Sequence, residues 1–206
     1  MSDTETVTPY PFTYPSRHTR RHGPTGYRDY GSYREWLRDE FTFRCVFCLN
    51  REQWGVVINA WHIDHFTPQS RDPGGTLSYD NLLYLCSTCN CLKSSHLVPD
   101  PGSVAFDEGL KILEDGTIQA LNDEGRLLIE VLRLNNDDRT RYRSLVLQTV
   151  RALAIQDRGA FSQWMGYPSN LPDLSKLRPP GNTRPAGIND SFFARRARGE
   201  LQETYE

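Results

Sequence analysis

Residues 44–96 read RCVFCLNREQWGVVINAWHIDHFTPQSRDPGGTLSYDNLLYLCSTCNCLKSSH. The stretch contains two pairs of cysteines, Cys45 with Cys48 and Cys86 with Cys89, and two residues separate the members of each pair. This spacing lets both sulfurs of a pair reach one ion at about 2.3 Å, and two pairs complete a tetrahedral site without an open position. We therefore predict a structural zinc ion that joins the two ends of the stretch.

The chain contains five cysteines in all, and an odd number in a chain that looks cytosolic argues against a disulfide framework. A small domain with little core of its own gains stability from a structural metal. Four ordinary buried cysteines would leave the paired spacing unexplained. Cys91 falls on a different side of the predicted helix from Cys89, and we expect it to be a free, buried thiol.

A second pattern of polar residues lies between and after the cysteine pairs. It consists of an Asp-His pair followed by Pro-Gln-Ser, then Asn-Leu, then Cys-Asn-x-x-Lys, and its candidate residues are Asp64, His65, Asn81, Asn90 and Lys93. Together and in this order, these motifs resemble the HNH endonuclease family. The resemblance covers residues 43–96 and implies a strand–loop–strand–helix unit built around one metal ion.

The resemblance implies a catalytic role for the Asp-His pair. Hydrolysis of a phosphodiester needs a deprotonated water, and His65 would be the general base because imidazole titrates near neutral pH. Asp64 and Asn90 would ligate a catalytic metal, and two oxygen ligands suit Mg²⁺ or Mn²⁺. Many relatives have a histidine where this chain has Asn90, and this difference favours a hard cation over zinc or nickel.

Three further residues of the motif have predicted roles. Asn81 would form hydrogen bonds across the loop and hold His65 in its productive orientation. Lys93 lies one helical turn after Asn90, on the same face, and would contact the phosphate or the developing charge. His62 shares a strand face with Asp64, and it is either an additional ligand, a phosphate contact or a histidine with a structural hydrogen bond.

The local patterns predict secondary structure around these motifs. We expect a helix over 32–42, with Ser32 as its N-cap and with Trp36 and Leu37 facing inward. We expect a strand over 56–63, a loop over 67–80, a strand over 82–85 and a helix that starts near Ser87.

The predicted pattern of secondary structure changes after Pro99. Short strands are predicted at 105–106, 111–113 and 117–120, and Asp115-Gly116 is a favourable hairpin turn. Apolar positions with helical spacing predict one helix that is capped by Asn122 and runs to about Leu134, and a second helix over 137–155. We read both helices as packing elements without a cofactor site.

These elements predict an α+β fold with a small ββα-metal core, stapled by the four-cysteine zinc site. A β-hairpin and two helices extend this core, and irregular basic arms flank it. The predicted division is a basic extended arm over 1–34, the nuclease domain over 35–100, the hairpin and helix-pair extension over 101–157, and a Pro/Gly/Arg-rich tail over 158–206.

The formal net charge of −2 hides a segregation of charge. Residues 15–34 carry five arginines against one acid, and residues 176–198 carry six basic residues against one acid. Basic arms of this kind release counterions when they meet phosphates, although they are equally consistent with solvated tails. We read residues 1–34 as an extended or partly disordered arm.

The sequence predicts a cytoplasmic protein without contact with a membrane. No apolar run approaches the roughly 18–20 residues that span a bilayer, and the N-terminus lacks an apolar signal segment. The layout is also similar to HNH nuclease subunits that work beside an ATPase in bacterial anti-phage defence. That similarity implies an ATPase or another regulatory subunit as a partner, and a lone nuclease is the plainer option.

Two functions compete for this sequence. The first is a metal-dependent endonuclease that cleaves DNA, with RNA open as a substrate because a small metal site reads a phosphate rather than a sugar. The second is a non-catalytic zinc knuckle that binds nucleic acid or protein. A binding knuckle needs only the cysteines, so the presence of Asp64, His65, Asn81 and Asn90 favours the enzyme.

Overall fold

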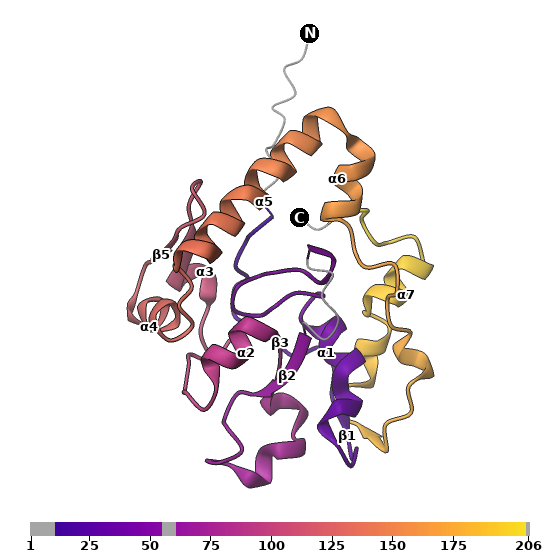
Figure 1. Cartoon of the computed structure of the whole chain (residues 1–206). Coiled ribbons are helices and arrows are strands. Elements are labelled where there is room, and N and C mark those ends of the chain that lie inside the picture. The colour runs from indigo at the N-terminus through magenta and orange to yellow at the C-terminus, as the bar shows by residue number, and fades with distance from the viewer. Residues whose placement is uncertain (1–10, 55–60, 205–206) are drawn as a thin grey trace.

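The computed structural model describes residues 11–54 and 61–204 (Figure 1), and these residues form helices and short antiparallel strand pairs. The strands are β1 (Pro24–Thr25), β2 (Trp61–His65), β3 (Leu82–Cys86), β4 (Leu110–Ile112), β5 (Ile118–Ala120) and β6 (Gly181–Asn182). The helices are α1 (Arg34–Glu40), α2 (Ser87–Lys93), α3 (Phe106–Gly109), α4 (Asp123–Val131), α5 (Asp137–Gln156), α6 (Arg158–Met165) and α7 (Phe192–Ala197). The predicted α+β fold is confirmed.

The centre of the molecule is the hairpin of β2 and β3, which continues directly into α2. Trp61 pairs with Cys86 at one end of the hairpin, and His65 pairs with Leu82 at the other. All five residues of β3 are buried, as expected of the apolar run Leu-Leu-Tyr-Leu-Cys. The predicted strand over 56–63 lies partly outside the described residues, and its described part continues to His65.

Helix α1 covers this hairpin with the side chains that the sequence assigned to the interior. Trp36 and Leu37 are both fully buried. The predicted cap is wrong, because Ser32 lies within a short 3₁₀ turn over Tyr30–Tyr33 and not at the start of the helix. Asp29 caps that turn instead, since its carboxylate accepts hydrogen bonds from the backbone N–H and the hydroxyl of Ser32.

The extension after Pro99 follows the predicted hairpin and helix pair. Asn122 caps α4 by accepting a hydrogen bond from the backbone N–H of Gly125, and α5 runs close to its predicted bounds. The predicted strand at 105–106 is wrong, because Phe106 begins the short helix α3. Of the apolar pair Ala105-Phe106, Phe106 is buried in the core. It reaches the core from a helix and not from a strand.

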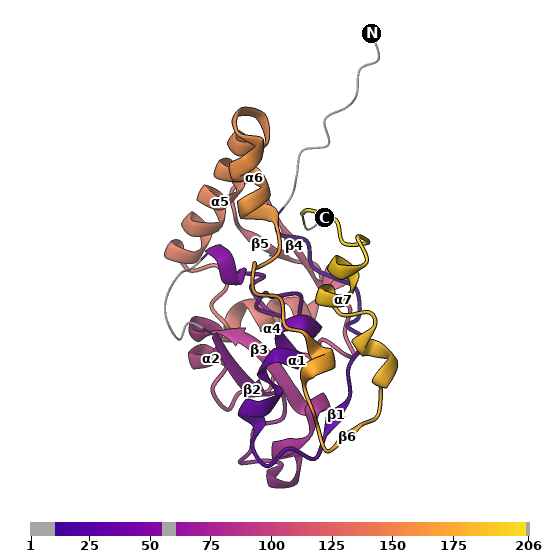
Figure 2. The ribbon, with the colours of Figure 1, turned by 90° about the vertical axis from the view of Figure 1, so that its right-hand side faces the viewer.

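The flanking segments, predicted as irregular arms, contain β1, α6, β6 and α7 besides irregular stretches, and the parts that the structure describes pack against the core. In Figure 2, β1 lies beside β6, and Pro24 pairs with Asn182. Phe12 and Tyr14 are buried in the main hydrophobic cluster. The expectation of a partly disordered arm is therefore wrong for residues 11–34.

Several arginines of these segments form contacts inside the fold. Arg21 donates to the carboxylate and the carbonyl of Asp39. Arg184 donates to the carbonyl of His22 at 2.6 Å and pairs with Asp80 at 2.7 Å. Some of the arginines in the two basic segments thus attach these segments to the core through hydrogen bonds and ion pairs.

One hydrophobic cluster joins the hairpin to the extension. It combines side chains of α1 and β3 with Leu128 of α4 and Val146, Leu147 and Val150 of α5. Residues 101–157 therefore share a core with the cysteine-rich unit. Among the residues that the structure describes, no helix is long and apolar enough to cross a membrane.

Candidate metal and nuclease site

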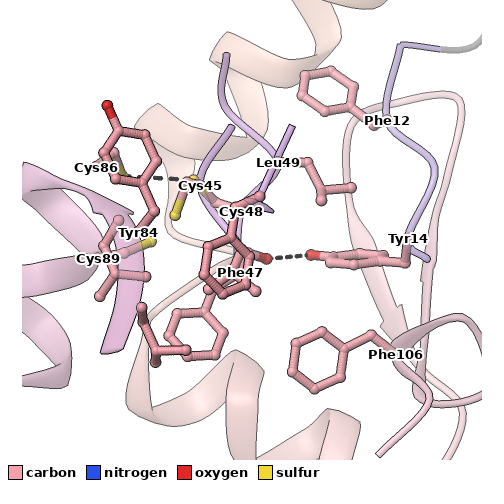
Figure 3. Close-up of a cluster of buried hydrophobic side chains, with 14 of the residues drawn as sticks. Phe12, Tyr14, Cys45, Phe47, Cys48, Leu49, Tyr84, Cys86, Cys89 and Phe106 are labelled. Atoms are coloured by element: carbon pink, nitrogen blue, oxygen red, sulfur yellow. Dashed lines mark hydrogen bonds between the residues drawn. The ribbon is translucent and has the colours of Figure 1, made fainter. Parts of the chain in front are cut away.

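The four paired cysteines meet in one buried cluster. Their sulfur atoms all lie within 4.8 Å of one another, and Sγ of Cys48 lies 3.6 Å from Sγ of Cys86. A tetrahedral ion with sulfurs at about 2.3 Å would separate them by about 3.8 Å, so the arrangement fits a four-thiolate metal site. Figure 3 shows the cysteines at one side of the aromatic cluster that includes Phe47 and Tyr14.

Local backbone geometry brings each pair together. Cys45 and Cys48 lie on a tight turn, in which the carbonyl of Cys45 accepts from the N–H of Leu49, and Leu49 has a positive φ of 60°. Cys86 ends β3 and Cys89 lies in the first turn of α2. Hydrogen bonds from the other three cysteines lower the pKa of the Cys48 thiol, whereas burial raises the pKa of the Cys45 thiol.

The fifth cysteine differs from the prediction. Cys91 is a free thiol as expected, but it is exposed rather than buried. Two residues along an α-helix correspond to a rotation of about 200°. Cys91 therefore faces away from the cluster that holds Cys89, and that side of α2 is open to solvent.

The imidazole of His65 is buried at the end of β2, where the following loop returns to it. Its Nε2 lies 2.9 Å from the carbonyl oxygen of Thr76. A carbonyl can only accept, so this contact requires the proton to be on Nε2. In neutral His65, Nδ1 then holds the free lone pair and is the ring nitrogen that can accept a proton.

Asn81 holds the loop that presents Thr76. Its side-chain oxygen accepts from the N–H of Thr67 at 2.8 Å, and its amide nitrogen donates to the carbonyls of Thr67 and Gly75. A Cβ on Gly75 would lie 2.2 Å from the carboxylate of Asp72 and 3.3 Å from the Asn81 amide, so a larger residue would have to displace the carboxylate that caps this turn. Asn81 thus holds Gly75 in place, and the next residue, Thr76, supplies the carbonyl that orients His65.

Lys93 lies behind the site. It is fully buried, and its Nζ lies 2.9 Å from Oδ2 of Asp64 and donates to the carbonyl of His65 at 2.7 Å. One lysine therefore holds both residues of the Asp-His pair. The Asp64 side chain keeps 18% of its surface exposed, so it can offer its other oxygen to a cation.

Two further predicted residues lie around Asp64. Asn90 is half-buried on α2, one turn before Lys93, and helical geometry places it on the face of α2 that meets β2. His62 is half-buried on β2 and pairs with Leu85, two residues before Asp64. A carboxylate and an amide oxygen are a donor set that suits Mg²⁺ or Mn²⁺.

Sequence analysis missed two neighbours of His65. Tyr30 packs its ring edge-on against His65, with centroids 5.1 Å apart, and stays 41% exposed. The side-chain amide nitrogen of Gln69 lies 3.3 Å from Nε2, and with the proton on Nε2 the amide can accept from the ring only if its oxygen faces it. Gln69 belongs to the Pro-Gln-Ser motif and could have been suspected, whereas nothing in the sequence connects Tyr30 to a residue 35 positions later.

Comparison with known proteins bears on this same segment. The family model described as HNH endonuclease matches residues 45–96. The search of curated proteins found no match. The matched segment begins at the first metal-site cysteine, contains β2, β3 and α2, and includes every predicted site residue. Residues 45–96 of this chain therefore form an HNH endonuclease domain.

Proposed function

We propose that this protein is a metal-dependent endonuclease that hydrolyses phosphodiester bonds in DNA. The observation that carries the proposal is the orientation of His65, whose Nε2 is bound to the Thr76 carbonyl. Its Nδ1 is then the nitrogen that can accept a proton. A general base needs a ring nitrogen with a free lone pair, and the bond to Thr76 leaves Nδ1 in that state.

In the proposed reaction, Nδ1 of His65 removes a proton from the attacking water. The imidazolium that forms keeps its Nε2–H bond to the Thr76 carbonyl, so the ring does not reorient as its charge changes. Asn81 keeps the loop fixed through its bonds to Thr67 and Gly75. Asn81 is a positioning residue in this scheme and carries no proton.

Asp64 and Asn90 would hold the catalytic cation, and Mg²⁺ or Mn²⁺ fits their oxygen donors. Such a cation would bind the scissile phosphate and stabilise the leaving oxygen. Because its Nζ is occupied by Asp64 and His65, Lys93 holds these two residues in our scheme, in place of the predicted phosphate contact. His62 stays a candidate third ligand.

The four-cysteine cluster would hold zinc in a structural role. Four thiolates fill a tetrahedral coordination sphere, so no position is left for water or substrate. The ion would fasten the turn before β2 to the start of α2. DNA is the proposed substrate because the domain is of the endonuclease family, and control by an ATPase partner stays a prediction.

Plasmid cleavage tests the proposed function. Purified protein is incubated with supercoiled DNA and Mg²⁺ or Mn²⁺, with and without EDTA. We expect cleavage that depends on the cation, and a loss of at least about 100-fold in the His65→Ala variant. His96→Ala is the matched control because His96 is exposed and has no role in the scheme.

The outcomes separate the two candidate functions. Cleavage by His65→Ala at the wild-type rate would exclude His65 as the base. DNA binding without cleavage, by protein that contains its metal and with either cation present, would favour the zinc-knuckle function. RNA of the same sequence serves as the second substrate and determines the choice of nucleic acid.

A further inference from the structure

Arg139, which lies outside the matched domain, reaches the cysteine cluster. It lies in the first turn of α5, and its Nη2 donates to Sγ of Cys89 at 3.1 Å. The same guanidinium donates through Nη1 to the carbonyl of Leu132 at 2.6 Å. The second bond fixes the guanidinium against the end of α4, so its contact with the sulfur does not depend on a freely moving side chain.

Charge explains what this contact can do. Four thiolates and one Zn²⁺ leave two negative charges in a buried site, and a buried charge without a partner is costly. A guanidinium on a metal-bound sulfur offsets part of that charge and makes a charge-assisted hydrogen bond. Outer partners of this kind orient the ligands and raise metal affinity.

The contact between α5 and the cluster is not a continuous apolar interface. A cavity of about 210 Å³ is lined by Cys48 and Cys86 from the cluster and by Arg139, Tyr142 and Arg143 from α5. Arg143 is buried, but it is engaged with the carbonyl of Gly116 and with Asn135. Arg139, in contrast, bonds directly to Cys89.

We propose that Arg139 is an outer-sphere partner of the metal, and that α5 is part of the metal centre although it lies outside residues 45–96. This inference rests on the four-cysteine site holding zinc and is independent of nuclease activity. The metal content of the wild-type chain tests the zinc site separately. If the wild-type chain contains no zinc, the four-cysteine zinc site is refuted. If it contains zinc, the rate at which the Arg139 variants lose zinc tests the role of Arg139.

The test is the rate of zinc release from the full chain to a chromogenic chelator. We expect Arg139→Gln to release zinc at least about tenfold faster than wild type, because loss of such partners costs about 10–100-fold in affinity. Arg141→Gln is the matched control. Arg141 carries the same charge on the same helix, but it is exposed and lies about 200° around the helix from Arg139.

Equal release from wild type, Arg139→Gln and Arg141→Gln would overturn the proposal, as would equally fast release from both variants. Circular dichroism with excess zinc shows whether Arg139→Gln is folded. If it is not, Arg139→Lys decides, because it keeps the charge and loses the forked pair of donors. Release from Arg139→Lys that is faster than wild type supports the proposal, and the wild-type rate overturns it.

Discussion

At the scale of single residues, the central unit is the Asp-His pair and the lysine behind it. Asp64 and His65 are neighbours on a strand, so their side chains point in different directions. Asp64 meets α2 through Lys93, and His65 meets the returning loop through Thr76. One buried lysine thus fixes the strand end from which both proposed functional groups project.

Replacing Lys93 by methionine tests this arrangement. The substitution keeps the volume of the side chain but removes the ion pair with Asp64 and leaves the carbonyl of His65 without its donor. Breaking a buried ion pair by removing one partner costs about 3–5 kcal/mol. We expect the free energy of unfolding in urea, measured with excess zinc, to fall by about 3 kcal/mol.

The control for this prediction is Lys111→Met, because Lys111 is exposed on β4. It should change stability little. A Lys93→Met protein as stable as wild type would mean that Lys93 does not hold Asp64 in solution.

At the scale of elements, the sequence predicted what depends on local pattern. The run over 82–85 became β3, the helix after Ser87 became α2, and Asn122 capped α4. These signals are local, because apolar runs, caps and cysteine spacing act within a few residues. The predicted cap of the first helix was wrong because a 3₁₀ turn over Tyr30–Tyr33, capped by Asp29, precedes α1 and contains Ser32.

Long-range contacts could not be predicted in the same way. Arg139 reaches a cysteine 50 residues earlier in the chain, and β1 pairs with β6 across more than 150 residues. Neither contact has a period, a cap or a turn that marks it in the sequence. The sequence supplied the candidate residues of the site, which stay predictions, whereas the environments of Lys93 and His65 depend on packing between elements.

At the scale of the whole molecule, a buried polar network joins the arms to the core. The side chain of Glu40 on α1 is fully buried. It accepts hydrogen bonds from the backbone N–H groups of Arg21 and His22 and from the hydroxyl of Tyr79. The neighbouring Asp39 accepts from the N–H of Phe192 in α7. Both ends of the described chain thus attach to two adjacent carboxylates.

This network predicts a pH dependence of stability. Burial alone would raise the pKa of Glu40, but hydrogen bonds from His18 and the Arg21 N–H lower it from 4.5 to about 2. A depressed pKa contributes stability above the unfolded pKa of 4.5, and this contribution is lost as pH falls toward about 2. The shift corresponds to about 3 kcal/mol.

Urea unfolding of wild type and Glu40→Gln across this pH range checks the prediction. We expect wild type to be the more stable above about pH 5, and the difference to shrink in acid as Glu40 is protonated. Comparing the two proteins at each pH cancels the loss of metal in acid. Glu108→Gln, at an exposed position, is the control, and a difference that does not vary with pH would contradict the assignment.

The most direct test of the central claim, that His65 is the general base of a nuclease, is chemical rescue. Plasmid cleavage by His65→Ala is measured with Mg²⁺ while imidazole is added, beside the Asn81→Ala variant. The account predicts that imidazole restores cleavage to His65→Ala, because it replaces the missing base, and leaves Asn81→Ala unchanged. Cleavage by His65→Ala at the wild-type rate without imidazole would contradict the account.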